Sequence, residues 1–186
     1  MNKLKISQVQ FQASHVPTLN AKIIEKSFNN TLKFKPHLIC TPECSNIITN
    51  DKSYLILNAP YQNTCPVLKM AKDFAKKNKV NINLGSLLLR IKNKSKLVNR
   101  SFFINNYGVI KKTYDKIHMF DVVINNKEKH QESSLFKAGN KIIFTKINNI
   151  KLGMTICYDL RFPNLYRQLA KKDCSIILVP AAFTRP

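Results

Sequence analysis

Three ionisable side chains follow the ends of predicted strands, and together they could carry out covalent chemistry on a carbonyl group. Glu43 follows the apolar run 38–40, Lys116 follows 109–114, and Cys157 closes 151–156. In open α/β sheets the carboxyl ends of the strands gather at one edge, where ligands bind. If these strands are neighbours, the carboxylate can move protons, the lysine can hold negative charge, and the thiol can form a thioester.

Cys157 lies where a strand is predicted to pass into a helix that starts within 158–163. Backbone N–H groups at a helix N-terminus favour negative charge, so they lower the pKa of a thiol and offer donors to an oxyanion forming beside the sulfur. We therefore predict a nucleophile. The alternative is a buried structural cysteine, which is common at strand ends. Taken alone, Glu43 could equally be a capping carboxylate and Lys116 a surface ammonium group.

The hydrophobic pattern predicts strands that alternate with helices. Residues 3–11 alternate polar and apolar, as a half-buried strand does, and Pro17 opens a helix with an apolar stripe from Leu19 to Leu32. The other predicted strands are 38–40, 80–91, 98–105, 109–114, 141–147, 151–156 and 175–180, and further helices start at Pro66 and Pro163. This order favours an α/β layered sheet. The polar stretch 121–140 is predicted to be an irregular functional loop or a lid.

Histidine and cysteine positions show no pattern typical of a metal site or a disulfide framework. His118 could serve as a base for Cys157, but a role in positioning its own loop is the preferred interpretation. The other histidines are scattered: His15, His37 and His130. The five cysteines are odd in number and lack C-x-x-C spacing, so neither disulfides nor a zinc knuckle is predicted. We expect no metal and no cofactor.

The formal net charge of +21 is the most unusual bulk property. Taken literally, it suggests a nucleic acid or an anionic membrane as partner. However, the 26 lysines far outnumber the 5 arginines, are spread along the chain and accompany 21 asparagines. We interpret this bias as genome-wide composition acting on solvated faces, and we expect neither nucleic acid nor membrane as partner. A non-catalytic polyanion-binding protein is the alternative from another class, supported only if the lysines form one continuous face.

A single domain over residues 1–186 is predicted, because this length allows one sizeable core. No stretch approaches the roughly 20 apolar residues that a membrane-spanning helix needs. The N-terminus has no apolar core of signal-peptide length. Together with the free thiols, these features favour a cytoplasmic location.

Four blocks of the sequence resemble the motifs of the carbon–nitrogen hydrolases of the nitrilase superfamily. They are Thr41-Pro42-Glu43, Tyr114-Asp115-Lys116-Ile117-His118-Met119-Phe120-Asp121, Gln131-Glu132-Ser133 and Gly153-Met154-Thr155-Ile156-Cys157-Tyr158-Asp159-Leu160-Arg161-Phe162-Pro163. They occur in the family's order. The resemblance implies a four-layer αββα sandwich with a Glu-Lys-Cys catalytic set, carried here by Glu43, Lys116 and Cys157. It also implies that Glu132 contacts the catalytic lysine.

The same resemblance implies an amidase. Segments 120–122 and 158–163 look most like the branch of omega-amidases and deaminated-glutathione amidases, so a small carboxylated amide is expected as substrate rather than a nitrile. The implied reaction hydrolyses a linear carboxamide through a thioester, and the Tyr158 N–H helps to hold the oxyanion. Arg161 is the candidate for binding a substrate carboxylate, since a guanidinium can do so in bidentate geometry. The alternative for Arg161 is an ion pair with Asp159 or another acid.

Two further alternatives keep the reactive thiol. The thioester could pass its acyl group to an amine, or Cys157 could act as a redox sensor, although no resolving cysteine is evident from the sequence. Relatives continue beyond a stretch like 180–186 into a helix and further strands. We therefore expect this chain to lack the C-terminal part of the fold, and we expect the full-length protein to be a homo-oligomer.

Overall fold

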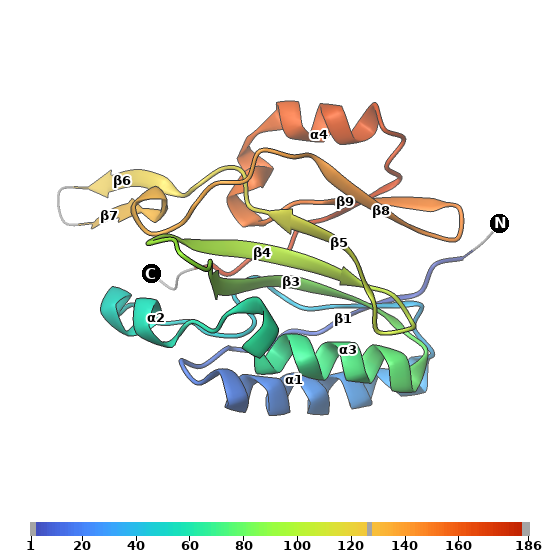
Figure 1. Ribbon diagram of the computed structural model, residues 1–186. Helices are drawn as coiled ribbons and strands as arrows, with labels where there is room; N and C mark the ends of the chain where they lie inside the picture. Colours follow the sequence, from blue (N-terminus) through green and yellow to red (C-terminus); the bar gives the residue numbers. More distant parts are fainter. Residues whose placement is uncertain (1–2, 126–127, 184–186) are drawn as a thin grey trace.

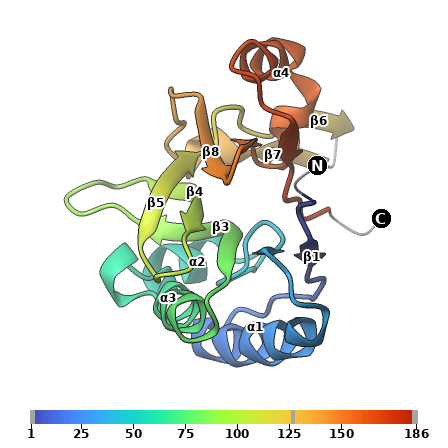
Figure 2. The same ribbon diagram turned by 90° about the vertical axis from the view of Figure 1, so that its right-hand side faces the viewer.

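The computed structural model describes residues 3–125 and 128–183 and arranges them in four layers (Figure 1). Helices α1 and α3 form one outer layer, two sheets stack in the middle, and α4 lies on the far side (Figure 2). The α/β class and the layered order predicted from the sequence are therefore confirmed. Residues 184–186, the last part of the segment 180–186 discussed in the sequence analysis, lie outside the described residues.

The first sheet has the strand order β1-β2-β3-β4-β5. Its strands are β1 (Ile6–Gln8), β2 (Leu38–Cys40), β3 (Asn81–Arg90), β4 (Leu97–Ile104) and β5 (Ile110–Asp115). Strands β1, β2 and β3 pair in parallel, whereas β4 pairs antiparallel with both β3 and β5. As a result, the carboxyl ends of β2 and β5 lie at one edge, on either side of β3 and β4, and this edge carries the site.

Two amphipathic helices cover one face of this sheet. They are α1 (Pro17–Thr31) and α3 (Pro66–Asn78), and each has a proline in its first turn. Proline suits this place because its missing N–H would have no partner there. Phe28 and Phe74 bring their rings within 5.1 Å of each other in the core beneath the helices. Leu19 is an exception to the predicted stripe, since it is 46% exposed.

The second sheet has the order β10-β9-β8 and packs against the other face of the first sheet. Its strands are β8 (Ile143–Ile147), β9 (Ile150–Met154) and β10 (Ile176–Leu178), and α4 (Pro163–Ala170) covers its outer side. Leu169 of α4 lies so close to Gly153 that a side chain at Gly153 would meet it. Apolar residues of both sheets, including Phe103 and Leu152, form the core between the sheets.

Two elements differ from the sequence prediction. The stretch predicted to be irregular contains a hairpin of β6 (Asp121–Asn125) and β7 (Glu128–Gln131), so that prediction was wrong there. The hairpin projects from the body (Figure 1), and the β-branched residues Val122 and Val123 of β6 favour an extended conformation, although Val123 is 66% exposed. A helix that was not predicted, α2 (Lys52–Asn58), starts at Asp51, whose carboxylate caps it by accepting from the Tyr54 N–H at 3.0 Å.

Among the described residues, no helix is long and apolar enough to cross a membrane. The same residues contain no group of three or more histidine, cysteine or acidic side chains that could hold a metal ion.

Candidate active site

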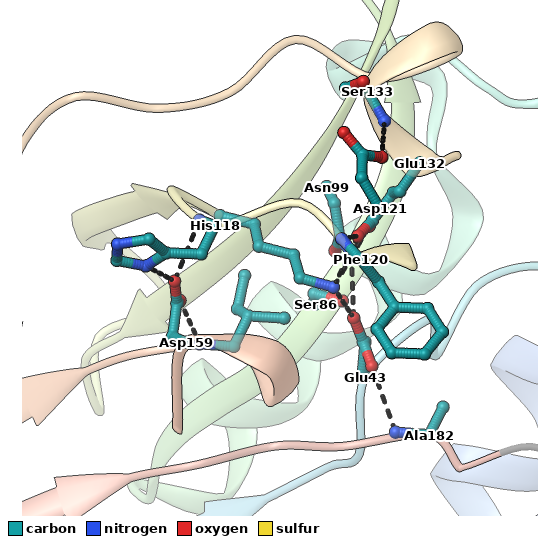
Figure 3. Close-up of polar contacts among 12 residues, drawn as sticks. Glu43, Ser86, Asn99, His118, Phe120, Asp121, Glu132, Ser133, Asp159 and Ala182 are labelled. Atoms are coloured by element: carbon teal, nitrogen blue, oxygen red, sulfur yellow. Dashed lines mark hydrogen bonds and ion pairs between the residues drawn. The ribbon is translucent and has the colours of Figure 1, made fainter. Parts of the chain in front are cut away.

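Glu43 lies in a tight turn directly after β2, and backbone contacts with β3 hold this turn in place. The Cys44 N–H donates to Ser86 Oγ at 2.9 Å, and the Ser45 N–H donates to the Ser86 carbonyl at 2.9 Å. Cys44 has a φ of 55°, in the left-handed region, which reverses the chain just after Glu43. The Glu43 side chain is thereby buried at 6% exposure, and its carboxylate faces the backbone of Ala182 (Figure 3).

Gly85 of β3 makes this turn possible because the turn backbone passes directly over it. A Cβ atom at Gly85 would lie 2.1 Å from the Thr41 carbonyl oxygen and 2.4 Å from the Pro42 carbonyl oxygen. These atoms belong to the backbone, so they cannot rotate away as a side chain can. A glycine is required at this position for close approach rather than for an unusual φ.

We expect Gly85→Ala to destabilise the fold by about 3 kcal/mol or more and to reduce any activity that depends on Glu43. The matched control is Gly153→Ala in β9, where an added Cβ meets only the Leu169 side chain, at 2.9 Å and beyond. That change should cost about 1 kcal/mol, because Leu169 can adjust. Denaturant unfolding of both variants measures the difference. Equal stabilities would show that the turn does not depend on Gly85.

Lys116 follows β5, and its ammonium group lies between two carboxylates. Its Nζ is 3.0 Å from Glu43 Oε1 and 2.9 Å from Glu132 Oε2. The backbone of Lys116 is fixed on both sides, since its N–H donates to the Asn99 carbonyl and its own carbonyl accepts from the Gly139 N–H. Lys116 is buried at 3% exposure, and Glu132 is also largely buried. The three side chains therefore form a buried ion cluster, of which Figure 3 labels Glu43 and Glu132.

The charge of Lys116 is fixed by its neighbours. Burial by itself lowers the pKa of this ammonium group, but the negative charges of Glu43 and Glu132 and their hydrogen bonds outweigh burial, so the pKa is raised. Lys116 therefore stays protonated at neutral pH and is unsuited to act as a base. It supplies a permanent positive charge in a dry part of the protein, where electrostatic interactions are strong.

Cys157 stands at a sharp turn between β9 and a 3-10 helix, Cys157–Arg161. Its φ of 45° is unusual for a residue with a side chain, and its N–H donates to the Pro180 carbonyl at 2.9 Å. The first hydrogen bond of the turn runs from the Asp159 N–H to the Ile156 carbonyl. The Tyr158 N–H precedes that bond, so it is one of the donors that a helix start leaves without an intrahelical acceptor.

The pKa of the Cys157 thiol is raised to about 12, which contradicts the lowered value predicted from the strand-to-helix position. Burial is the largest cause, and the negative charge of Glu43 adds to it, whereas Lys116 acts in the opposite direction. The thiol also forms a hydrogen bond with Glu43. At neutral pH the thiol therefore keeps its proton, and Glu43 is the carboxylate placed to accept it.

The carbon–nitrogen hydrolase family model matches residues 7–185, nearly the whole chain. This chain belongs to the carbon–nitrogen hydrolase family.

Curated relatives of this chain include two amidases. It is 34% identical to deaminated glutathione amidase from Dictyostelium discoideum, over 100% of this chain and 66% of the relative. It is 27% identical to omega-amidase NIT2 from Xenopus tropicalis, over 98% of this chain and 65% of the relative. The chain thus spans about two thirds of the length of these relatives. Both belong to the branch of the nitrilase superfamily that the sequence blocks predicted.

A solved structure shares the fold. The NitFhit protein of Caenorhabditis elegans superposes with a TM-score of 0.86 at 27% identity, over 97% of this chain and 44% of that chain. The arrangement of layers described above is therefore that of the nitrilase fold.

In this carbon–nitrogen hydrolase, Asp159 connects the segment that carries Lys116 to the turn that carries Cys157. The Asp159 carboxylate is fully buried and accepts from Tyr114 Oη at 2.7 Å and from the Ile156 N–H at 2.8 Å. It also accepts from the His118 N–H and lies 2.7 Å from His118 Nδ1 (Figure 3). Asp159 thus ties the end of β5 to the turn that carries Cys157 and fixes two elements that are distant in the sequence.

The hydrogen-bond partner of His118 is Asp159, and its ring stacks on Phe162 with 3.7 Å between the ring centroids. These contacts are those of a residue that fixes the conformation of its own loop. The Asp159 carboxylate is fully engaged with the groups above, and within the described residues it forms no ion pair with Arg161. Arg161 is instead exposed on the wall of the cavity.

A cavity of about 520 Å³ opens onto Glu43, Lys116 and Cys157. Its wall contains every residue that the sequence analysis assigned to the site, including Glu132, Tyr158 and Arg161. Phe120 and Phe183 add apolar surface, and Lys52 and Lys129 add positive charge. The structure therefore brings all the predicted site residues to one cavity.

The sequence analysis missed two groups that hold Glu43. Asn99 Nδ2 donates to Glu43 Oε1 at 3.0 Å and lies 3.5 Å from Glu132 Oε1. The Ala182 N–H donates to Glu43 Oε2 at 3.0 Å (Figure 3). Asn99 has a detectable signal, since it is a lone amide within the largely apolar run 97–104. Ala182 contacts Glu43 through its backbone N–H, so its residue type gives no indication of this contact in the sequence.

A second thiol, Cys44, also lines the cavity. Its pKa is raised well above the ordinary value, first by burial and then by the charge of Glu43. Cys44, like Cys157, is therefore a neutral thiol at neutral pH.

Proposed function

We propose that this protein hydrolyses a linear carboxamide to a carboxylic acid and ammonia through a thioester on Cys157. The observation that carries the proposal is the position of Glu43. Its carboxylate contacts both the Cys157 thiol and the Lys116 ammonium group. Glu43 can therefore move the thiol proton, while Lys116 supplies a fixed positive charge. The printed names of the relatives, deaminated glutathione amidase and omega-amidase, support an amide substrate.

The first half of the reaction forms the thioester. Glu43 accepts the thiol proton as Cys157 sulfur attacks the carbonyl carbon of the amide. The electron pair of the C=O bond moves to oxygen, and Lys116 and the Tyr158 N–H stabilise the resulting oxyanion. When the oxyanion collapses, the C–N bond breaks and Glu43 returns its proton to the departing nitrogen. Ammonia leaves, and the acyl group remains on sulfur.

The second half consumes water. Glu43, again a carboxylate, accepts a proton from a water molecule that attacks the thioester carbonyl, and the same donors hold the second oxyanion. The C–S bond breaks, sulfur regains the proton from Glu43, and the acid is released. Glu132 does not transfer protons in this scheme. It balances the charge of Lys116 and holds the ammonium group in place through contacts of 2.9 and 3.1 Å.

Arg161 is proposed to bind a carboxylate at the far end of the substrate. It is exposed on the cavity wall and has no ion-pair partner among the described residues, so its guanidinium is available to a ligand. Lys52 and Lys129 also line the cavity and add positive charge to its wall. A small amide with a remote carboxylate matches this charge distribution.

Replacing Arg161 tests this role. We expect Arg161→Lys to raise the KM for a carboxylated amide about tenfold, because lysine cannot provide two parallel hydrogen bonds. The KM for an uncharged amide of similar size should stay within about twofold. Arg167→Lys on α4 is the control, since Arg167 is exposed outside the cavity. An unchanged KM for the carboxylated amide would remove Arg161 from substrate binding.

The proposal as a whole is tested by intact-mass spectrometry during turnover of a carboxylated amide such as a deaminated glutathione or an omega-amide of a 2-oxo acid. The expected adduct equals the acyl group, and peptide mapping should place it on Cys157. Adding hydroxylamine then separates two reactions of the same thioester. Free acid as the main product supports hydrolysis, whereas a dominant hydroxamate supports acyl transfer. Ammonia release with no trapped acyl group, or an adduct on another residue, would contradict the proposal.

A further inference from the structure

A second cavity, of about 650 Å³, lies on the opposite face of β3 and β4 from the catalytic residues. The alternation of strand side chains separates the two cavities. On β4, Asn99 points to Glu43 on the catalytic side, while its neighbours Val98 and Arg100 line the second cavity. Residues of α3 and of the 3-10 turn Gln62–Thr64 complete the wall, so the cavity lies at the edge of the helical layer.

The wall of this second cavity is strongly positive. Its charged residues are Lys69, Lys72, Arg90, Lys92 and Arg100, with Asp73 as the one carboxylate in the wall. Arg100 is already paired, because its guanidinium forms a two-point contact with the Asp115 carboxylate at 2.5 and 2.9 Å. The other four cations have no ion-pair partner within the described residues. The cavity therefore holds more positive charge than its own residues balance.

Of the four cations without an ion-pair partner, Arg90 is the one whose position is fixed by an aromatic ring. Its guanidinium lies 4.5 Å from the centroid of the Tyr61 ring. The segment that carries Tyr61 is held against the end of β3, where the Arg90 N–H donates to the Pro60 carbonyl at 3.0 Å. Arg90 Nε is buried and has no acceptor within the described residues. A buried donor without an acceptor costs free energy, so a site of this kind is satisfied when an acceptor binds.

We propose that this cavity binds a small molecule that carries a diphosphate or a similar phosphate group. The proposed amide hydrolysis does not require such a ligand. A guanidinium that is stacked on an aromatic ring presents a planar, oriented pair of N–H donors, and phosphate oxygens match this geometry. Four cations without ion-pair partners, against the one carboxylate of Asp73 in the wall, leave more positive charge than a single ligand carboxylate would balance. A phosphate ester carries close to two negative charges at neutral pH, and a diphosphate carries more.

The test is calorimetric titration of the protein with inorganic pyrophosphate at near-physiological salt, with citrate as a polyanion of similar charge and different geometry. We expect one pyrophosphate per chain, bound at least tenfold more tightly than citrate. A protein with a net charge of +21 also attracts anions without a site. Binding without saturation at one equivalent, or equal affinity for citrate, would show this general attraction and overturn the proposal.

Matched variants on a single helix locate the binding. Lys72 lines the cavity, whereas Lys76, one turn further along α3, is exposed outside its wall. Lys72→Met should weaken pyrophosphate binding at least threefold and Lys76→Met by less than 1.5-fold, roughly, although both remove one charge. Arg90→Lys should weaken it about tenfold while keeping the charge. Equal losses in the two lysine variants would overturn the assignment of the site. Thermal unfolding and amide turnover of each variant report on the fold independently.

Discussion

Cys157→Ala is expected to reduce amide turnover by roughly ten-thousandfold or more, to the level of the background reaction, while the fold stays intact. The loss follows because no other group on the cavity wall can replace the sulfur. Cys44 lines the same cavity and is also held as a neutral thiol, but Glu43 acts on it through its charge, whereas Glu43 is hydrogen-bonded to the Cys157 thiol and can accept its proton.

The fold should tolerate this change for a local reason. Cys157 has a φ of 45°, and alanine has the same Cβ atom, so the backbone strain is the same before and after the substitution. The variant loses the hydrogen bond between the thiol and Glu43, whereas the bonds from Asn99 and Ala182 to Glu43 remain.

The measurements are ammonia release and thermal unfolding. Cys174→Ala is the matched control, because Cys174 is a partly buried thiol in the turn between α4 and β10, away from the cavity wall. This control should retain parental turnover. A Cys157→Ala protein that releases ammonia at the parental rate would remove Cys157 from the mechanism.

Glu43→Gln is expected to act in opposite directions on two properties of Cys157. Amide turnover should fall about 10² to 10⁴-fold, because the glutamine cannot accept the thiol proton. Alkylation of Cys157 by iodoacetamide should become faster. The negative charge of Glu43 raises the pKa of the thiol and Lys116 lowers it, so removing Glu43 lowers the pKa of Cys157.

The pH dependence of the alkylation rate shows the direction of this effect. In the parental protein the pKa of Cys157 is about 12, so the alkylation rate should rise steadily with pH from neutral into the alkaline range, without a plateau near pH 8. Each unit by which the pKa falls in Glu43→Gln increases the thiolate fraction at neutral pH about tenfold. The lower nucleophilicity of a less basic thiolate offsets about half of this gain on a logarithmic scale.

Stability needs a separate measurement for Glu43→Gln. If the glutamine oxygen faces Lys116 and Asn99, its NH₂ group faces the Ala182 N–H, and two donors then oppose each other. The lost bond should cost about 1–3 kcal/mol. Glu25→Gln, an exposed carboxylate on α1, controls for a change of charge alone. Slower alkylation of Cys157 together with parental turnover would contradict the assigned role of Glu43.

The amino-acid sequence alone was enough to locate the strands beside the candidate site and the ionisable residues that follow them. The apolar runs located β2, β5 and β9, and the polar residues just beyond them were Glu43, Lys116 and Cys157. This works because strand ends and the residues after them are local features, and strand pairing in an α/β fold brings such ends to one edge. The motif blocks then related the chain to a family with this fold.

Other properties of the site were decided only by the tertiary structure. The pKa of Cys157 is raised because burial and Glu43 outweigh Lys116 and the backbone N–H of Ala182, and Glu43 lies more than one hundred residues away in the chain. Asn99 and the Ala182 N–H could not be assigned to Glu43 from local patterns, since each contact joins different strands or turns. Charge and burial act through space, so neither their balance at the thiol nor the cavity around Arg90 can be obtained from residue order alone.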